Sequence, residues 1–397
     1  MNFVFISPQF PASYWNFCDR LKQRGVNVLG IGDTPYDAMS WEVKNALTEY
    51  YRVDSMEDYD QMVRAMGYFT HRYGKIDWLE SNNEYWLEQD AKLREDFHIT
   101  TGMQPKQVAI VRRKSQMKKY YEKAGVPVAA YHMVSTLEEG LAFAKKVGYP
   151  VFVKPDGGMG AEDSYKLKNE EDMRRFYETK LDVPYIMEEF IEGDIWSYDG
   201  ISDSKGNIIF DAVVSWPKSV ADIVNKKDHL AYYTANMVPE DLKQKGRATV
   251  KAFGVKSRFF HLEFFRLTKA KKGLGEVGDI VALEVNMRPA GGWTPDMYNF
   301  ANSVDVYSIW ADMVVYDKTY VDLSQPKYFC AYASRRYGKP YVHTVEEIIE
   351  AFGDKIVLDE EIPESLSGAM GNHMWTAKLD SEAEKDRFIR MVQKTRE

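Results

Sequence analysis

Short apolar runs alternate with helical stretches along the first hundred residues, and this alternation restricts the fold more than any other feature. Residues 3–6 and 26–31 have the composition of buried strands, and residues 13–24 between them that of a helix ending at Gly25. The pattern continues with a helix over 57–73, a strand over 76–79 and a helix over 84–97. Strand–helix alternation at this spacing predicts a parallel, doubly wound sheet. Because Ser7-Pro8-Gln9 follows the first strand in place of a glycine-rich turn, we expect a Rossmann-like layer without a dinucleotide fingerprint.

Length and charge limit the function classes. A chain of 397 residues is too long for one hydrophobic core and predicts two to four units. The formal net charge of −8 argues against a nucleic-acid partner, which would need a surplus of Lys and Arg. The two cysteines, Cys18 and Cys330, lie far apart, so neither a disulfide framework nor a structural zinc site is expected. No apolar run reaches membrane-spanning length and the first residues lack a basic n-region, so we expect a cytoplasmic protein without a membrane partner.

The rest of the chain mixes the two element types. A helix over 114–123 leads through Gly125-Val126-Pro127 to a strand, a helix over 136–147 and a strand that Pro155 ends. Further strands are predicted over 185–191, 207–215, 261–266, 280–286, 329–333 and 374–379, and helices over 173–180, 304–315, 345–351 and 382–394. The predicted class is therefore α/β for the N-terminal part and α+β for the remainder of the chain.

The segment from Leu283 to Gly292 is the richest in chemically useful side chains. Glu284 and Asn286 are two residues apart in a predicted strand, so they share one face, and Arg288 stands at its end. The preceding strand contains Glu263, which a hairpin would bring beside Glu284 and Asn286. Two carboxylates and an amide oxygen, completed by phosphates, are a typical magnesium site. The alternative is an ordinary solvated sheet face.

Lys154 ends a strand and is followed by a glycine cluster. Glycines allow backbone N–H groups to approach a phosphate, and the lysine supplies a positive charge. Three glycines belong to this cluster, Gly157, Gly158 and Gly160. Taken alone, three glycines after a strand are also typical of a simple turn, and no Walker sequence is present.

A third segment, residues 186–193, is an apolar strand that runs into Gly193. Its backbone could bind adenine while its side chains line the ring; the alternative is a core strand with two exposed glutamates.

Two other motifs are set aside. The Gly-x-Gly-x-x-Gly at 273–278 joins two strands and opens no helix. His261-Leu262-Glu263 resembles half of a zinc deaminase signature, but its Pro-Cys-x-x-Cys partner is missing.

In this order the motifs resemble the ATP-grasp superfamily, carboxylate–amine ligase type, which includes L-amino-acid ligases and carbamoyl-phosphate synthases. The resemblance implies a Rossmann-like N-terminal domain over 1–112, an ATP-grasp small lobe over 113–192, a large lobe with a metal site over 193–318, and a small C-terminal α+β extension over 319–397. It implies that ATP is bound by Lys114, Lys154, Gly157, Gly158, Gly160, Glu188, Glu189, Phe190 and Ile191. Many members have a ribose-binding Glu two residues after the hinge glycine, where this chain has Ile195; Asp194 and Asp199 are the candidates to replace it, and the ribose contact stays open.

The resemblance also implies the chemistry. Glu263, Glu284 and Asn286 would hold Mg²⁺, with Mn²⁺ as an alternative ion, and Lys154 and Arg288 would act on the transferring phosphoryl group. ATP would convert a small-molecule carboxylate to an acylphosphate, which an amine attacks, releasing ADP and phosphate. Two alternatives use the same fold: an ATP-dependent small-molecule kinase and a non-catalytic nucleotide sensor. The acid, the amine and the oligomeric state stay open, with a homodimer as one option.

Overall fold

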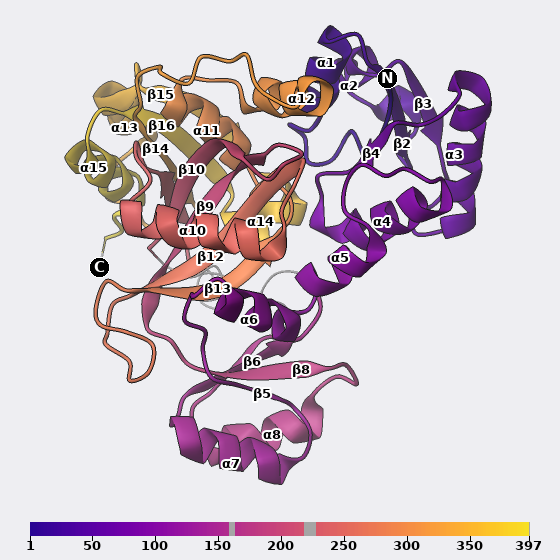
Figure 1. Cartoon of the computed structure of the whole chain (residues 1–397). Helices are drawn as coiled ribbons and strands as arrows, with labels where there is room; N and C mark the ends of the chain where they lie inside the picture. The colour runs from indigo at the N-terminus through magenta and orange to yellow at the C-terminus, as the bar shows by residue number, and fades with distance from the viewer. Residues whose placement is uncertain (159–162, 218–227, 397) are drawn as a thin grey trace.

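The computed structural model describes residues 1–158, 163–217 and 228–396, and the strands in these ranges form three sheets (Figure 1). The first sheet is parallel and has the order β3-β2-β1-β4. Its strands are β1 (Asn2–Ile6), β2 (Asn27–Gly32), β3 (Glu49–Arg52) and β4 (Trp78–Glu80). The helical elements of this part are α1 (Trp15–Gln23), η1 (Tyr36–Ala38), α2 (Trp41–Ala46), α3 (Tyr59–Tyr73), η2 (Glu84–Trp86), α4 (Leu87–Asp96) and α5 (Pro105–Val111). The predicted parallel layer is confirmed, although β3 and α2 were missing from the prediction.

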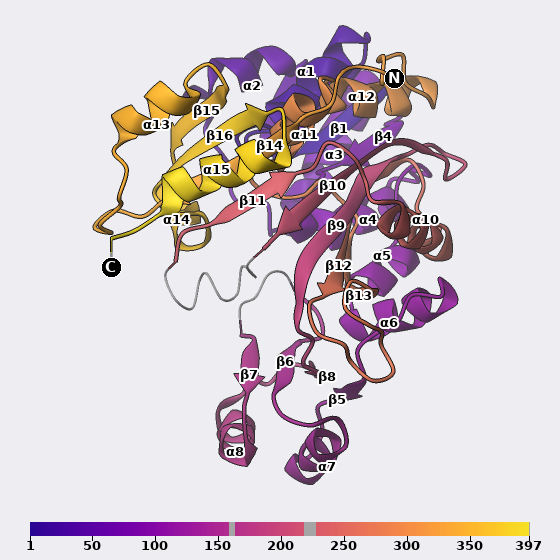
Figure 2. The same ribbon diagram turned by 90° about the vertical axis from the view of Figure 1, so that its left-hand side faces the viewer.

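The second sheet forms the small lobe, at the bottom of Figures 1 and 2. It is antiparallel in the order β5-β8-β6-β7. The strands are β5 (Tyr131–Met133), β6 (Val151–Pro155), β7 (Tyr165–Leu167) and β8 (Tyr185–Glu189). Two amphipathic helices, α7 (Leu137–Val147) and α8 (Glu170–Thr179), bury Phe143 and Phe176 against it. The lobe therefore has a small core of its own.

The third sheet is antiparallel, has eight strands and follows the order β13-β12-β9-β10-β11-β14-β16-β15. Its strands are β9 (Gly193–Ser202), β10 (Ile208–Trp216), β11 (Ala231–Thr234), β12 (Arg258–Leu267), β13 (Ile280–Asn286), β14 (Phe329–Arg335), β15 (Ile356–Glu361) and β16 (His373–Leu379). The accompanying helices are α10 (Glu240–Phe253), α11 (Thr294–Asn302), α12 (Val306–Tyr316), α13 (Val345–Phe352), α14 (Glu364–Met370) and α15 (Glu382–Gln393).

The C-terminal residues, which we expected to form a small α+β extension over 319–397, add strands to the large sheet. Strand β14 pairs with β11 from Ala231↔Ala333 to Thr234↔Cys330, and β16 and β15 follow outward from β14. The large sheet therefore continues without a break across the boundary predicted at 318/319. The sequence conceals this continuity because β11 is only four residues long and β14 lies about a hundred residues further along the chain.

The N-terminal domain and the large sheet share one core. Phe17 of α1 packs edge-on against Trp310 of α12, with ring centroids 5.0 Å apart. Arg24 forms an ion pair with the largely buried Asp312, with Nε and Oδ1 2.6 Å apart. These contacts fix the N-terminal domain against the large lobe. Among the described helices, none is both long and apolar enough to cross a membrane.

Candidate active site

The predicted hairpin of β12 and β13 brings the expected metal-ligating side chains together. Glu263 lies opposite Glu284 in the strand register. Two residues further along each strand, His261 lies opposite Asn286. The register shifts after Glu263, so that Phe264 pairs with Ala282. Such a bulge bends a strand and re-aims its side chains. We call Glu263, Glu284 and Asn286 the carboxylate edge, because they lie on the outermost two strands of the large sheet.

Three lysines face this edge, and we call Lys114, Lys118 and Lys154 the cationic cluster. Lys154 ends β6, whereas the other two lie one turn apart on α6 (Lys114–Lys123). Helix α6 packs against α10 and β13 of the large lobe, so the cluster draws on both lobes. Lys114 Nζ is 3.4 Å from Glu284 Oε1, which joins the cationic cluster to the carboxylate edge.

A single buried carboxylate balances two of these lysines. Glu188 of β8 forms ion pairs with Lys118 and with Lys154, the latter at 2.8 Å between Nζ and Oε2. Burial opposes ionisation of Glu188, but the two lysines outweigh it and lower its pKa to about 2. Burial lowers the pKa of Lys118, whereas Glu188 and Glu284 raise the pKa of Lys154 against the effect of burial. Glu188 therefore stabilises the buried positive charges of Lys118 and Lys154, and a phosphate-binding site requires such charges.

His261 also belongs to the site, although its motif was set aside in the sequence. Its ring bridges two carboxylates: Nδ1 is 2.6 Å from Asp199 Oδ1, and Nε2 is 2.9 Å from Glu263 Oε1. Burial alone would lower the pKa of His261, but Asp199 and Glu263 raise it to about 9. Asp199 in turn accepts hydrogen bonds from Ser197 and from the Tyr298 hydroxyl at 2.7 Å. His261 therefore orients the Glu263 side chain.

The other predicted residues fall into several groups. Glu189, Phe190 and Ile191 line the same cavity as the lysines, and the Glu189 carboxylate accepts a hydrogen bond from the Ala130 amide at 2.7 Å. Both Glu188 and Glu189 are buried, so the alternative of a strand with two exposed glutamates is wrong. Two residues were candidates for the ribose contact. Asp194 lies on β9 but does not line the cavity, and Asp199 is hydrogen-bonded to His261.

The glycine loop after β6 is described only in part. Gly158 has a φ of +104° and its carbonyl accepts a hydrogen bond from Lys114 Nζ at 3.3 Å. Gly157 precedes it and lies close to the Arg112 carbonyl. Gly160 lies outside the described residues.

Arg288 is held at the junction with the N-terminal domain. Its Nη2 lies 3.4 Å from Asn286 Oδ1, and its Nε lies 3.5 Å from Glu84 Oε2 of η2. Glu84 also pairs with Arg112 at 3.0 Å. An acidic residue of the first domain thus orients an arginine at the carboxylate edge.

These side chains surround one cavity of about 870 Å³. Its wall includes the cationic cluster, the carboxylate edge, Glu188, His261 and Arg288, together with apolar residues from both lobes. That volume lies within the usual range for small-molecule sites, roughly 300–1,000 Å³. In the described ranges, no three His, Cys, Asp or Glu side chains converge to hold a metal ion by themselves. Two carboxylates and an amide would instead suit an ion such as Mg²⁺, which keeps waters and phosphates as its remaining ligands.

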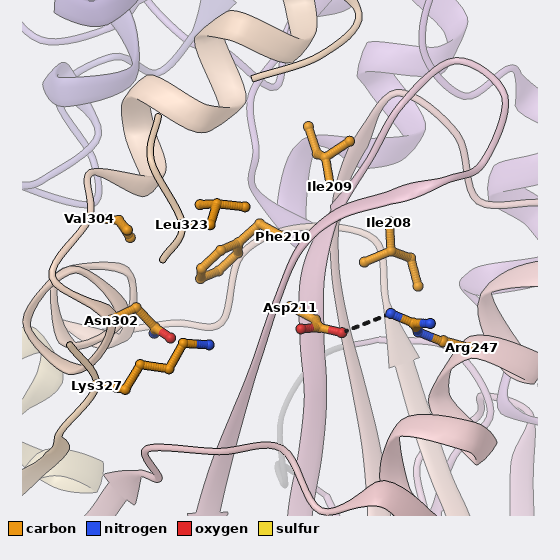
Figure 3. A pocket seen from close by; sticks show the side chains of 9 residues that line it. All are labelled: Ile208, Ile209, Phe210, Asp211, Arg247, Asn302, Val304, Leu323 and Lys327. Atoms are coloured by element: carbon orange, nitrogen blue, oxygen red, sulfur yellow. Dashed lines mark ion pairs between the residues drawn. The ribbon is translucent and has the colours of Figure 1, made fainter. Parts of the chain in front are cut away.

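A second cavity lies apart from this site, beside β10 and the residues after α11 (Figure 3). Its volume is about 160 Å³, below the usual range for ligand pockets of roughly 300–1,000 Å³. Its acidic side chain, Asp211, accepts a hydrogen bond from Tyr198 at 2.9 Å and pairs with Arg247 at 3.5 Å. We therefore assign no ligand to it.

The chain is similar to known proteins in sequence and in fold. Residues 113–212 match the family described as carbamoyl-phosphate synthase L chain, ATP binding domain. Over 118 residues, 28% of this chain, the sequence is 30% identical to the carbamoyl phosphate synthase large chain, C-terminal section, of Methanopyrus kandleri. The match spans 22% of that protein, so this chain covers about a fifth of the length of such curated relatives.

Solved structures match along nearly the whole chain. The L-amino acid ligase from Bacillus licheniformis has a TM-score of 0.71 at 15% identity, covering 98% of this chain and 96% of that one. The biotin carboxylase domain of the Hydrogenobacter thermophilus 2-oxoglutarate carboxylase, a dimer in complex with MgADP, ADP and bicarbonate, has a TM-score of 0.70 at 16% identity, covering 98% and 89%. Over nearly its whole length this chain therefore has the ATP-grasp fold of these solved structures, and its residues 113–212 match the ATP-binding domain of carbamoyl-phosphate synthase.

Proposed function

We propose that this protein is an ATP-dependent ligase that activates a carboxylate as an acylphosphate and joins it to an amine, releasing ADP and phosphate. One observation carries the proposal: a cationic cluster and a carboxylate edge face each other in one cavity, with Lys114 Nζ 3.4 Å from Glu284 Oε1. A nucleotide triphosphate bound with a divalent cation has the complementary charges, because its phosphates match the lysines and its cation matches the carboxylates.

Each residue has a role in this proposal. Lys114, Lys118 and Lys154 bind the phosphates, and residues 188–191 of β8 and its end hold the adenine. Glu263, Glu284 and Asn286 would hold Mg²⁺, or Mn²⁺ in its place, and a bound ion of this kind would neutralise charge on the phosphates. Arg288, oriented by Glu84, stabilises the phosphoryl group as it passes from ATP to the carboxylate oxygen. The amine then attacks the acyl carbon, the C–O bond to phosphate breaks, and the amine loses its proton.

The similar proteins support the reaction class. One solved neighbour is described as an L-amino acid ligase and another was solved with MgADP and bicarbonate. Amino acids and bicarbonate both offer a carboxylate-like oxygen that can accept a phosphoryl group. A homodimer is compatible with this proposal, since the second neighbour is described as a dimer.

The test is a stoichiometric assay on the purified full chain. With MgATP and pairs drawn from a panel of acids and amines, ADP and phosphate should form in equal amounts only when both substrates are present. Hydroxylamine should replace the amine and yield a hydroxamate. Release of AMP and pyrophosphate would contradict the proposal, and a stable phosphorylated product without an amine requirement would favour a kinase. A Glu284→Gln protein, which loses one carboxylate of the carboxylate edge, serves as the background control.

A further inference from the structure

Two groups of apolar residues from different parts of the chain line the large cavity, and we call these groups its two ends. One end contains Ala129, Phe152 and Ile191 of the small lobe and its border. The other contains Trp216, Leu230, Tyr232 and Met370, which come from β10, from β11 and its preceding residue, and from α14. A nucleotide has one apolar group, its base, so the second end needs a different occupant.

The second end adjoins the carboxylate edge. The Trp216 ring meets the His261 ring edge-on with centroids 5.7 Å apart, and His261 is hydrogen-bonded to Glu263. On its other side Trp216 stacks on Tyr232, with centroids 5.8 Å apart and an interplanar angle of 20°. We call Trp216 and Tyr232 the aromatic wall. A molecule resting against it would lie next to the site of phosphoryl transfer.

Buried neighbours position the aromatic wall and Met370. Tyr232 stacks on Tyr332 at 4.7 Å between centroids, and the Tyr332 hydroxyl donates a hydrogen bond to the Met370 carbonyl at 2.8 Å. Arg336 holds the end of α14 by donating to the Ser367 carbonyl at 3.1 Å and the Gly368 carbonyl at 2.8 Å. The position of Met370 is thus set by side chains on β14 and just beyond it.

Gly292 leaves the space that Met370 occupies. It has a φ of +64°, and a Cβ built there would lie 2.8 Å from Met370 Cε. The methionine therefore packs directly on the chain that follows Arg288. The acidic side chain at this end, Asp228, is paired with Lys339 at 2.9 Å, so its charge is balanced locally. This end of the cavity is therefore suited to apolar groups.

We propose that Trp216, Tyr232 and Met370 bind the apolar side chain of one of the two substrates, so that the enzyme selects an acid or an amine with a branched aliphatic or aromatic side chain. This inference rests on the proposed function for the reaction, whereas the binding preference can be measured without turnover. Apolar burial against such a wall favours a matching side chain over none by about 10-fold or more.

The test measures binding and turnover in parallel. Calorimetry on the full chain with Mg²⁺ and a non-hydrolysable ATP analogue uses L-leucine, L-phenylalanine, 4-methylpentanoate and isopentylamine as apolar probes, and glycine and L-aspartate as comparisons. At least one apolar probe should bind about 10-fold or more tightly than glycine. Met370→Lys should remove this preference, because it places a charge against the aromatic wall. Met370→Leu should retain it, and so should Met237→Lys, since Met237 is 72% exposed and lies outside the cavity wall.

The outcomes separate the two proposals. Loss of apolar binding in Met370→Lys alone, with unchanged affinity for the ATP analogue, supports the inference even if no acid–amine pair releases phosphate. Turnover that prefers glycine or aspartate and is unaffected by Met370→Lys overturns the inference while the ligase function stands. If no apolar probe binds and no pair turns over, both are overturned.

Discussion

The cationic cluster and the carboxylate edge face each other across one cavity, but they are built in opposite ways. The lysines carry their own counter-ion, because Glu188 lies between Lys118 and Lys154. The two carboxylates do not share a partner: Glu263 pairs with His261 at 2.9 Å, and Glu284 meets Lys114 at the longer distance of 3.4 Å. We infer that the cationic cluster is already positioned before the nucleotide binds. The carboxylate edge gains its remaining partner, the divalent cation, together with the nucleotide.

The largest effect is expected on the negative side. Glu284→Gln removes one of two carboxylates from the carboxylate edge, so turnover should fall about 100-fold or more at saturating MgATP. Phosphate release measured over a range of Mg²⁺ concentrations checks this. Glu276→Gln, an exposed position in the loop of the same hairpin, should behave as wild type. Near-normal activity of Glu284→Gln would contradict a role of the carboxylate edge in holding the metal ion.

A smaller effect is expected on the positive side. Lys154→Met should weaken ATP binding about 10-fold to 100-fold, because one of three lysines is lost and Glu188 is left with Lys118 alone. Calorimetric titration with an ATP analogue gives the affinity directly. Lys168→Met, an exposed lysine after β7, is the matched control. An unchanged affinity would mean that Lys154 serves only to balance Glu188.

Glu188, the counter-ion of Lys118 and Lys154, should also affect the stability of the protein in acid. The folded-state pKa of Glu188 is about 2, below its ordinary value of 4.5, so its ionisation stabilises the fold above pH 4.5. That contribution is lost as the pH falls from 4.5 toward 2. Glu188→Gln should lower the Tm by a few degrees at pH 6 and should show a shallower fall in Tm between pH 4.5 and 3 than wild type.

Thermal melts at pH 6, 4.5 and 3 check this prediction. Glu122→Gln, an exposed glutamate on the same helix as Lys118, should keep the wild-type acid slope. A Glu188→Gln protein with an unaltered acid slope would show that the two lysines do not depend on this carboxylate.

Much of the fold could be predicted from local patterns. The hairpin pairing of Glu263 with Glu284 followed from side-chain alternation in two adjacent strands. Strand β9 was not predicted, although it lies between β12 and β10, because its Gly193, Asp194 and Gly200 are typical of turns. Neighbouring strands on both sides supply the pairing that local propensity does not.

Two site residues were also missed, for different reasons. Lys118 lies four residues after Lys114 on one helix, and that spacing places both on the same face, so the pattern was available in the sequence. His261 acquires its role from Asp199, which is 62 residues away and reaches it only through the pairing of β9 with β12. No local pattern could have indicated that contact.

The continuity of the eight-stranded sheet has a mechanical consequence. The carboxylate edge on β12 and β13 and the aromatic wall on β10 and β11 belong to one sheet, in which β9 pairs with both β12 and β10. Lys154, in contrast, belongs to a separate sheet. The large sheet therefore fixes the distance between the carboxylate edge and the second substrate, whereas the distance from Lys154 to the carboxylate edge depends on how the small lobe is placed against this sheet.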